Sequence, residues 1–319
     1  MKNIFEELGF PKDHRKASKV TQLVKHFDEV PDTKKKWPML CQIKKDGCCA
    51  IVLNQKDTKI FSRSGKRFQN IQNLEKEFRE SGAPRGVYFA ELCNDDCSLE
   101  TLSGIVNPNR IKPLDEDQEQ VLPSNYLSYY DVMPIQDFIY GSCFELYKDR
   151  YENLSWMVPN KFDILELFIA NDEQEANELF NDTINAGEEG IVLRNNWDWI
   201  AGHKGFRTMK KVRGVDFDLE CIGVEEGKGK YTGLVANLFF KWKDTEIKAM
   251  LGKGWSHSDA REMFSNCRFK TDSPIGKIFQ VYALQISSKG KLRLPKVGEL
   301  RHDKLESDNV LDAQGEKED

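Results

Sequence analysis

The sequence predicts an α+β protein with antiparallel sheets, followed by a small β-barrel domain. Between residues 40 and 212, short β-prone runs and helical stretches occur without a regular βαβ pattern. After residue 212 the chain becomes β-rich, with turn residues between the runs. Because 39% of the 319 residues are apolar and 31% are charged, the composition is that of globular domains and not of a disordered chain.

The chain before residue 40 is expected to form short helices and polar linkers. Two small apolar faces support this: Ile4, Phe5 and Leu8, and then Val20, Leu23, Val24 and Phe27 at helical spacing. Short apolar runs then predict strands at 41–45, 49–54, 58–63, 86–93, 127–133 and 190–195. Helices are predicted at 70–80 and at 173–186, where Asp172 is the N-cap, Glu175 completes a capping-box-like pair and Gly187 ends the helix.

The β-rich part has strand-like runs at 215–225, 233–242, 245–251 and 278–287, with a helix near 257–267. Roughly five strands in about ninety residues fit a small Greek-key barrel such as an OB-fold. We therefore expect one domain at 1–212, a second at 213–309, and a disordered tail at 310–319.

Charge and cysteine content exclude several classes of protein. The net charge of -5 argues against a simple polybasic binder but allows basic residues to gather on one face. The eight cysteines lack zinc-site spacing, so they are expected to be reduced and mostly structural. No run approaches 18 apolar residues and the first residues lack a signal-peptide pattern, which predicts a cytoplasmic protein that does not enter a membrane.

The familiar nucleotide-binding and hydrolase signatures are absent. The sequence contains no GxxxxGK[ST], no GxGxxG after a strand, no HExxH and no GxSxG. A nucleotide would therefore have to bind by another route.

One segment, Lys44-Lys45-Asp46-Gly47, is predicted to lie where a strand ends in a turn. A lysine there can present its amine to a phosphate, but it becomes a nucleophile only after losing its proton. Nearby positive charge or a metal would have to lower the lysine pKa, and Asp46 could hold such a metal. Taken alone, the segment also fits a charged β-turn.

The segment is the first of an ordered series along the chain. It is followed by Ser62-Arg63-Ser64-Gly65, Val87-Tyr88-Phe89-Ala90-Glu91-Leu92, Tyr129-Tyr130-Asp131-Val132, Gly187-Glu188-Glu189-Gly190-Ile191-Val192-Leu193-Arg194, Met209-Lys210-Lys211 and Leu300-Arg301-His302-Asp303-Lys304. The series resembles the covalent nucleotidyltransferase motifs of ATP-dependent DNA ligases, most closely the small phage and bacterial ones. The resemblance covers about residues 37 to 305 and implies an adenylation domain followed by an OB-fold domain.

The resemblance implies that Lys44 attacks the α-phosphate of ATP, forming lysyl-AMP and releasing pyrophosphate. Gln42 lies where the family contacts the adenine edge, and Tyr130 matches the aromatic residue that stacks on adenine. Glu91 matches the glutamate that holds the ribose hydroxyls, and Arg63 matches the arginine that holds the ribose or the nick phosphate.

The same resemblance assigns residues to metal and phosphate. Glu189 matches the metal-binding glutamate, and Asp46 and Glu91 complete the expected metal set. Lys210 matches a lysine that neutralises the α-phosphate. The closing motif, Arg301, Asp303 and Lys304, matches the segment that orients the pyrophosphate leaving group.

Several of these residues have competing interpretations. Tyr129 and Glu188 are the register rivals of Tyr130 and Glu189, because neighbouring strand residues face opposite ways. Glu91 could be a buried salt-bridge partner, and the closing motif alone could be an ordinary solvated patch.

Two positions depart from the family pattern. Cys49 stands where the family usually has an arginine, five residues after the nucleophile. Thr208 replaces the first of two lysines in the fifth motif. Lys211 and Arg207 are the nearby cations that could compensate, although a neighbour in a strand points the other way.

The implied function is sealing of 5′-phosphate/3′-hydroxyl nicks in duplex DNA, as in DNA repair or replication, by a monomer in a bacterial or phage-infected cell. ATP and Mg²⁺ are the implied cofactors, and Mn²⁺ is expected to substitute. Binding should rest chiefly on phosphates, with Lys228, Lys230, Lys241, Lys243, Arg110 and Lys112 as candidate contacts.

Three alternatives remain open at this point. An mRNA-capping guanylyltransferase shares the lysine motif, the two-domain plan and the closing motif, whereas RNA ligases generally lack the closing motif. A non-catalytic OB-type nucleic-acid-binding protein would use Phe239, Phe240, Trp242 and Trp255 for stacking, but it leaves the motifs before residue 212 unexplained.

Overall fold

The computed structural model describes residues 2–252, 254–269, 271–283, 286–287 and 290–311. The chain divides into two compact units, Met1–Val212 and Arg213–Asp319, and each is described by itself. Most of the expected tail, from residue 312 onward, lies outside the described residues. Val310, at the start of that tail, is buried against the core of the second unit.

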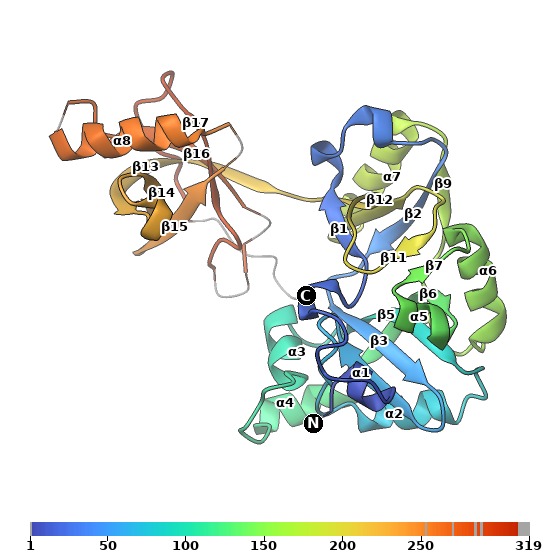
Figure 1. Ribbon diagram of the computed structural model, residues 1–319. Helices are drawn as coiled ribbons and strands as arrows, with labels where there is room; N and C mark the ends of the chain where they lie inside the picture. Colours follow the sequence, from blue (N-terminus) through green and yellow to red (C-terminus); the bar gives the residue numbers. More distant parts are fainter. Residues whose placement is uncertain (1, 253, 270, 284–285, 288–289, 312–319) are drawn as a thin grey trace. The chain divides into compact units, whose positions relative to one another are not determined.

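The first unit contains two five-stranded sheets and a short two-stranded one (Figure 1). The first sheet has the strand order β1 (Leu23–His26), β12 (Lys204–Val212), β10 (Gly190–Arg194), β2 (Met39–Lys44) and β9 (Phe168–Ala170). The second has the order β4 (Thr58–Ser62), β3 (Cys48–Asn54), β5 (Gly86–Cys93), β6 (Tyr126–Met133) and β8 (Asp163–Ile164). The short sheet pairs β7 (Ser142–Cys143) with β11 (Trp199–Ile200). The motif around Lys44 is thus the link between the two large sheets.

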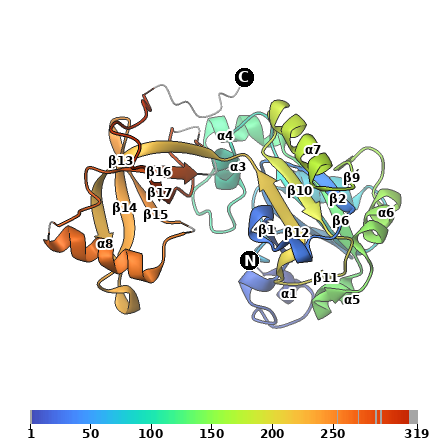
Figure 2. The ribbon, with the colours of Figure 1, turned by 90° about the horizontal axis from the view of Figure 1, so that it is seen from above.

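Helices pack on both large sheets. The helices of this unit are α1 (Ile4–Glu7), α2 (Gln72–Arg79), α3 (Leu99–Ile105), α4 (Glu116–Val121), α5 (Ile135–Tyr140), α6 (Tyr147–Met157) and α7 (Glu173–Asn185), with 3-10 turns at Ala17–Lys19, Phe27–Glu29, Asp32–Lys34 and Leu122–Ser124. Helix α7 packs on the first sheet, beside β10 and β9 (Figure 2). Helices α2, α3 and α6 cover the outer face of the second sheet. Helices α1 and α5 pack on the opposite face of the second sheet, and the candidate site lies where the two large sheets meet.

Strand β6 has a β-bulge at its two neighbouring tyrosines. Phe89 of β5 pairs with Asp131 and Ala90 pairs with Tyr129, so Tyr130 is the extra residue. Tyr129 points into the outer core, where it is fully buried against Phe78. Tyr130 points to the opposite face.

The expected helix around Val20–Phe27 is wrong. Leu23–His26 form strand β1, which pairs in parallel with β12. Val20 packs with the α1 core, whereas Phe27 packs under the first sheet with Met39, so the apolar residues belong to two different clusters. Helical spacing arises here by chance, because pairing at a sheet edge decides the local structure.

The other predicted elements of the first unit are present, and the sheets are mixed. Asp172 caps α7 by accepting a hydrogen bond from the Glu175 backbone at 2.9 Å. The Glu175 side chain binds the Asn171 backbone instead of completing a box with Asp172. Most pairs are antiparallel, as expected, but β1 with β12, β6 with β8, and β15 with β17 of the second unit are parallel.

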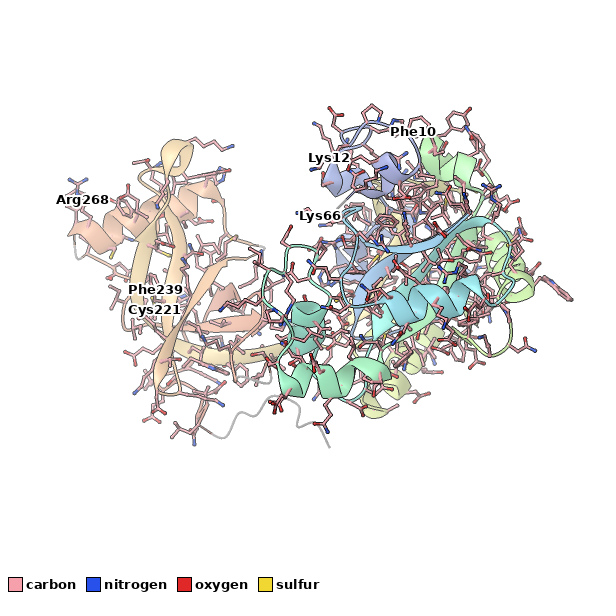
Figure 3. The ribbon with its side chains drawn as sticks, turned by 90° about the horizontal axis from the view of Figure 1, so that it is seen from below. Phe10, Lys12, Lys66, Cys221, Phe239 and Arg268 are labelled. Atoms are coloured by element: carbon pink, nitrogen blue, oxygen red, sulfur yellow. The ribbon has the colours of Figure 1, made fainter. Side chains whose placement is uncertain are left out.

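The second unit is a closed barrel. Its strands follow the order β13 (Val215–Glu226), β14 (Val235–Trp242), β15 (Thr245–Leu251), β17 (Lys296–Leu300) and β16 (Ile278–Ala283), with a 3-10 turn at Gly229–Tyr231 and helix α8 (His257–Phe269). Cys221 lies on β13 and Phe239 on the adjacent β14, and Arg268 lies at the end of α8 (Figure 3). Among the described residues, no helix is long and apolar enough to cross a membrane.

The buried tyrosines of the outer core allow a direct test of packing. The Tyr129 hydroxyl is buried and has no hydrogen-bond partner among the described residues, whereas the Tyr88 hydroxyl donates to the Pro84 carbonyl at 2.6 Å. We predict that Tyr129→Phe leaves the free energy of unfolding unchanged or raises it by about 1 kcal/mol, while Tyr88→Phe lowers it by about 1 kcal/mol. Urea denaturation measures both; a larger loss for Tyr129→Phe than for Tyr88→Phe would contradict the assigned packing.

Candidate active site

The site is built on the face of the first sheet that α7 leaves uncovered. Lys44 pairs with Gly190, and Gln42 pairs with Val192, which in turn pairs with Lys210. Because residues opposite each other in a sheet point to the same side, these side chains form neighbouring rows on one face. Lys44 is the last residue of β2, at the point where the chain leaves for the second sheet.

Gly190, which pairs with Lys44 on one side, makes the close pairing of β10 with β12 possible on the other. Its φ is +147°, and a Cβ at this position would lie 2.2 Å from the Lys211 carbonyl oxygen. Only glycine fits there without moving β12. The residue before it, Glu189, is therefore held at the end of β10, beside Lys44.

Two lysines and two glutamates form matched ion pairs at this end of the sheet. Lys44 Nζ lies 2.5 Å from Glu189 Oε2 and 3.3 Å from the Lys45 carbonyl oxygen. Lys45 pairs with Glu188. The structure therefore places Glu189 at Lys44 and gives Glu188, its register rival, a different partner.

The Lys44 amine is protonated in the ligand-free protein. Burial would lower its pKa, but the negative charges of Glu189, Glu91 and Asp46 outweigh burial and raise the pKa above its ordinary value. The sequence predicts that nearby positive charge or a metal lowers this pKa. The surroundings are acidic instead, so the amine becomes a nucleophile only when that charge is compensated.

Glu91 reaches the site from the second sheet. It lies on β5, opposite Cys49 of β3. A Cβ on Gly47 would lie 2.7 Å from Glu91 Cγ and 2.6 Å from the Leu92 carbonyl oxygen, so the glycine of the lysine motif lets the link between the sheets lie against β5. Burial raises the pKa of Glu91 to about 7, and Lys44 works in the opposite direction.

Cys49 lies where the family usually has an arginine. Its thiol contacts the Tyr130 hydroxyl at 3.7 Å, and burial raises its pKa to about 12, so it is not a reactive thiolate. Arg63, in the exposed turn after β4, is near enough for its charge to lower the pKa of both Cys49 and Glu91. Arg63 thus supplies positive charge beside the cysteine.

Tyr130 stands on the same side of the second sheet as Glu91. Its ring packs on Phe89 at 6.4 Å between centroids, and the Arg194 guanidinium lies 5.4 Å from its centroid. Tyr130, Tyr147 and Arg194 line a pocket, with further residues from both sheets. The rings of Tyr130 and Tyr147 thus form an aromatic wall of this pocket.

Gln42 is buried, and its side chain has a fixed orientation. Its amide oxygen accepts hydrogen bonds from the Tyr147 hydroxyl and from Arg194, each at 2.7 Å, and its nitrogen donates to the Leu165 carbonyl at 3.0 Å. Because a guanidinium can only donate, the oxygen must face Arg194 and the amide cannot flip. One N–H of the amide remains for another partner.

The replaced lysine of the fifth motif is not restored by the expected neighbours. Thr208 accepts a hydrogen bond from Gln22. Lys211 lies on the α7 side, where it binds Asn177, and Arg207 is paired with Asp198 at 3.0 Å. Arg194 lies directly opposite Thr208 on β10 and points to the same side. Arg194 therefore supplies the positive charge opposite Thr208.

The expected metal residues are near one another but do not form a ready-made site. The charges of Asp46 and Glu189 both raise the pKa of Glu91, and all three carboxylates act on Lys44. In the described part of the chain, no group of three or more His, Cys, Asp or Glu side chains is arranged to hold a metal ion.

The closing motif lies in the second unit, directly after β17. Arg301 binds Asp303 through Nε at 2.9 Å and Nη2 at 2.7 Å, and it binds Asp218 through Nη1 at 2.7 Å. Lys304 binds Asp218 at 2.5 Å and Asp308 at 3.2 Å. The Arg301 contact lowers the pKa of Asp303 to about 2. The motif is therefore a connected charge network and not a loose solvated patch.

Some candidate nucleic-acid contacts serve the fold instead. Arg110 donates to the carbonyl groups of Gly104, Lys112 and Pro113, so it braces its own loop. Phe240 and Trp242 are buried in the barrel core and cannot stack on bases. Trp255 is half-buried and donates to the Gly298 carbonyl.

Four of the candidate lysines are exposed: Lys112, Lys228, Lys230 and Lys241.

Sequence reasoning missed two residues of the site in the first unit and one residue at the closing motif of the second unit. Arg194 and Tyr147 orient Gln42, and Asp218 joins Arg301 to Lys304. Arg194 ends one of the quoted motifs, and its place on a strand could have suggested the same face as Thr208. Tyr147 and Asp218 carry no local signal, because each acts on a residue more than eighty positions away.

In the first unit, one sheet ends in a lysine and a second sheet supplies a glutamate and a tyrosine. The second unit is a closed five-stranded barrel. These features define a nucleotidyltransferase-type fold with an OB-like domain. Family comparison agrees: residues 17–212 match the ATP dependent DNA ligase domain and residues 226–301 match the DNA ligase OB-like domain. The chain belongs to the ATP-dependent DNA ligase family.

Individual relatives give the extent of the similarity. The DNA ligase of Enterobacteria phage T4 is 24% identical over 249 residues, which cover 63% of this chain and 50% of the phage protein. The DNA ligase of Nitrosopumilus maritimus is 28% identical over 138 residues, covering 39% of this chain and 24% of that protein. The chain thus spans half the length of these relatives or less. The solved structure titled "Pmar-Lig_Pre." shares the fold, with a TM-score of 0.72 at 21% identity over 89% of this chain and 68% of that one.

The raised pKa of Glu91 predicts a pH dependence of stability. The pKa of this glutamate is near 4.5 in the unfolded chain and about 7 in the folded protein. Deprotonation therefore destabilises the folded state. This cost is absent below pH 4.5, grows between pH 4.5 and 7, and is constant above pH 7. Glu91→Gln should remove a cost on the order of 3 kcal/mol. In urea denaturation with a chelator present, we expect the variant to gain stability over the parent as pH rises from 4.5 to 7. Glu77→Gln, an exposed acid on α2, is the control; a pH-independent difference for Glu91→Gln would refute the assignment.

Proposed function

We propose that this protein is an ATP-dependent DNA ligase that seals nicks with a 5′-phosphate and a 3′-hydroxyl in duplex DNA. The observation that supports this most directly is the half-buried Lys44 amine, held by Glu189 where the two sheets meet and close enough to Glu91 and Asp46 for their charges to raise its pKa. Three carboxylates act on this one buried amine, and ionisable groups perturbed in this way cluster at functional sites. Membership of the ligase family supplies the reaction class.

In the proposed first step, Lys44 Nζ attacks the α-phosphorus of ATP. A nitrogen–phosphorus bond forms, the bond to the pyrophosphate oxygen breaks, and pyrophosphate leaves. The amine must lose a proton, and Glu189 Oε2 at 2.5 Å is the contacting atom that can accept it. Catalysis of such a displacement rests mainly on positioning and on neutralising phosphate charge. Lys210, on the row next to Lys44, is assigned to that neutralisation.

The base and ribose fit on the aromatic side of the site. Tyr130 offers its ring for stacking, and Glu91 offers a carboxylate to ribose hydroxyls. Gln42 has its oxygen committed to Arg194 and Tyr147, so its side chain can offer only its remaining N–H to the adenine edge. Arg63 is assigned to the ribose or to the phosphate at the nick.

The donor set around Lys44 fits a magnesium ion. The available ligands are carboxylate oxygens from Glu189, Asp46 and Glu91, which Mg²⁺ prefers, and Mn²⁺ accepts the same ligands. Because no three-ligand group is preassembled in the described residues, most of the ion's ligands would be water and phosphate oxygens, as is usual for Mg²⁺. When bound, the ion supplies positive charge that offsets the acids and the triphosphate.

Two further steps complete the proposed reaction. AMP passes from Lys44 to the 5′-phosphate of the nick, so the nitrogen–phosphorus bond breaks and a pyrophosphate linkage forms. The 3′-hydroxyl then attacks the activated phosphate, AMP leaves and the phosphodiester bond closes. Sealing requires no reading of base sequence, so contacts should be chiefly to the DNA backbone. We propose that the protein acts on nicked double-stranded DNA as a monomer.

The first prediction of this proposal concerns the nucleophile. Incubation with Mg²⁺ and α-labelled ATP should label the parent protein, and Lys44→Ala should abolish labelling because the attacking amine is gone. Lys45→Ala is the matched control, since this neighbour pairs with Glu188 and should leave labelling within about threefold of the parent. Gel electrophoresis and mass spectrometry of the adduct measure both.

The outcomes of this assay separate the related activities. Labelling by GTP in place of ATP would indicate a capping-type guanylyltransferase. Sealing of nicked RNA but not of nicked DNA by the labelled protein would indicate an RNA ligase. Persistent labelling of Lys44→Ala would disprove the assigned nucleophile.

The second prediction concerns the closing motif. Arg301→Ala should slow self-adenylylation by at least about tenfold, because the guanidinium is assigned to the leaving pyrophosphate. Sealing of a nick that already carries AMP should fall much less, since no pyrophosphate leaves in that step. Single-turnover kinetics measure the two steps separately. Equal losses in both would count against the assigned role.

A further inference from the structure

Asp218, on the first strand of the barrel, is a buried carboxylate that joins the two cations of the closing motif. Its Oδ2 lies 2.7 Å from Arg301 Nη1 and 2.5 Å from Lys304 Nζ. Only 5% of the residue is exposed. Its other oxygen, Oδ1, is buried without a hydrogen-bond partner in the described part of the chain. A carboxylate is costly to bury in this way, so its position is fixed by the two cations.

The backbone of Asp218 also holds the segment that carries the motif. Strand β17 ends at Leu300, and residues 301–311 contain no helix or strand. The Asp218 N–H donates to the Asp308 carboxylate at 2.7 Å, and the Asp308 N–H donates to the Asp218 carbonyl at 2.8 Å. At its start, the segment is held by the Arg301 N–H, which donates to the Ile278 carbonyl at 2.8 Å. Asp218 therefore fixes the far end of the segment as well as both of its cations.

The three acids of the network differ in exposure. The side chain of Asp303 is 65% exposed and that of Asp308 is 39% exposed, whereas that of Asp218 is 7% exposed. Exposed ion pairs contribute little and exchange partners readily. Breaking a buried pair from one side leaves an uncompensated charge and costs much more. Asp218 is therefore the lasting partner of the cations, and Asp303 is the exchangeable one.

Arg301 divides its donors between these two acids. Nη1 binds the buried Asp218, while Nε and Nη2 form a two-pronged contact with the exposed Asp303. The same Nε–Nη2 edge binds carboxylate and phosphate in the same geometry. A phosphate can thus replace Asp303 at this edge while Nη1 stays on Asp218.

We propose that Asp218 is a positioning residue for formation of lysyl-AMP. It holds Arg301 and Lys304 in place while Arg301 exchanges Asp303 for the pyrophosphate part of ATP. The proposal rests on the proposed function of the chain. Asp218 contacts no substrate and acts only through Arg301 and Lys304.

The test compares Asp218→Asn with Asp216→Asn, a matched control on the same strand. Asp216 is exposed and accepts a hydrogen bond from Gln280 at 3.2 Å. The full chain is assayed for labelling of Lys44 by α-labelled ATP with Mg²⁺, and for sealing of a nicked duplex that already carries AMP. Circular dichroism melting checks that each variant is folded.

Asp218→Asn should slow labelling at least about tenfold and sealing less than about threefold, while Asp216→Asn stays within about twofold in both. Because Asp218 acts through Arg301 and Lys304, adding Asp218→Asn to a variant that carries both Arg301→Ala and Lys304→Ala should slow labelling by less than about threefold more. The proposal is overturned if Asp218→Asn labels as fast as Asp216→Asn, or if it slows labelling and sealing equally. It is also overturned if Asp218→Asn slows labelling as much in the variant without the two cations as it does in the parent.

A second variant covers loss of folding. If Asp218→Asn melts below the assay temperature, Asp218→Glu is compared with Asp216→Glu, because it keeps the charge and displaces the carboxylate. A loss confined to labelling supports the proposal, and parity overturns it. A parent protein that forms no lysyl-AMP would overturn the proposed function and this proposal with it, whereas a normal parent with unaffected Asp218 variants overturns this proposal alone.

Discussion

The ion pair between Lys44 and Glu189 is the contact on which the arrangement of the site depends. It exists because β2 and β10 are paired with Lys44 opposite Gly190, and because Gly190 has no side chain to push β12 away. Since β2 ends at Lys44 and β3 begins at Cys48, the chain crosses between the sheets directly after the amine. The lysine motif is therefore the connection between the two sheets, and it also carries the candidate reactive groups.

The second sheet places an acidic residue and an aromatic residue beside this connection. Glu91 lies against Gly47, and Tyr130 lies on the face opposite Tyr129, which remains in the outer core. Alternation alone separates the two tyrosines, and the extra residue of the bulge sets the facing of the residues beyond them, so that Val132 returns to the outer core. The bulge thus lets a continuous apolar core and an aromatic wall share one strand.

Much of the architecture could be predicted from the sequence, because apolar runs and turn residues report local structure. The strands at 49–54 and 86–93 and the helix begun by Asp172 are examples. The prediction failed at Leu23–His26, where the apolar spacing reflects two separate clusters and not one helix face. Residues that act over long sequence distances, such as Tyr147 on Gln42, leave no local pattern, so only the folded chain shows them.

The departures at Cys49 and Thr208 move positive charge but do not abolish it. Arg63 lies near enough to Cys49 and Glu91 to act on the pKa of both, and Arg194 lies opposite Thr208 on the same face. Arg194 is also tied to Gln42, which brings its charge close to the aromatic wall and away from Lys44. Near Lys44 itself, three carboxylates act on one amine, so a triphosphate would meet net negative charge there. Charge balance at this point must come from cations that arrive with the substrate or from other segments, which is the physical reason for the cations of the closing motif and a divalent ion in the proposed reaction.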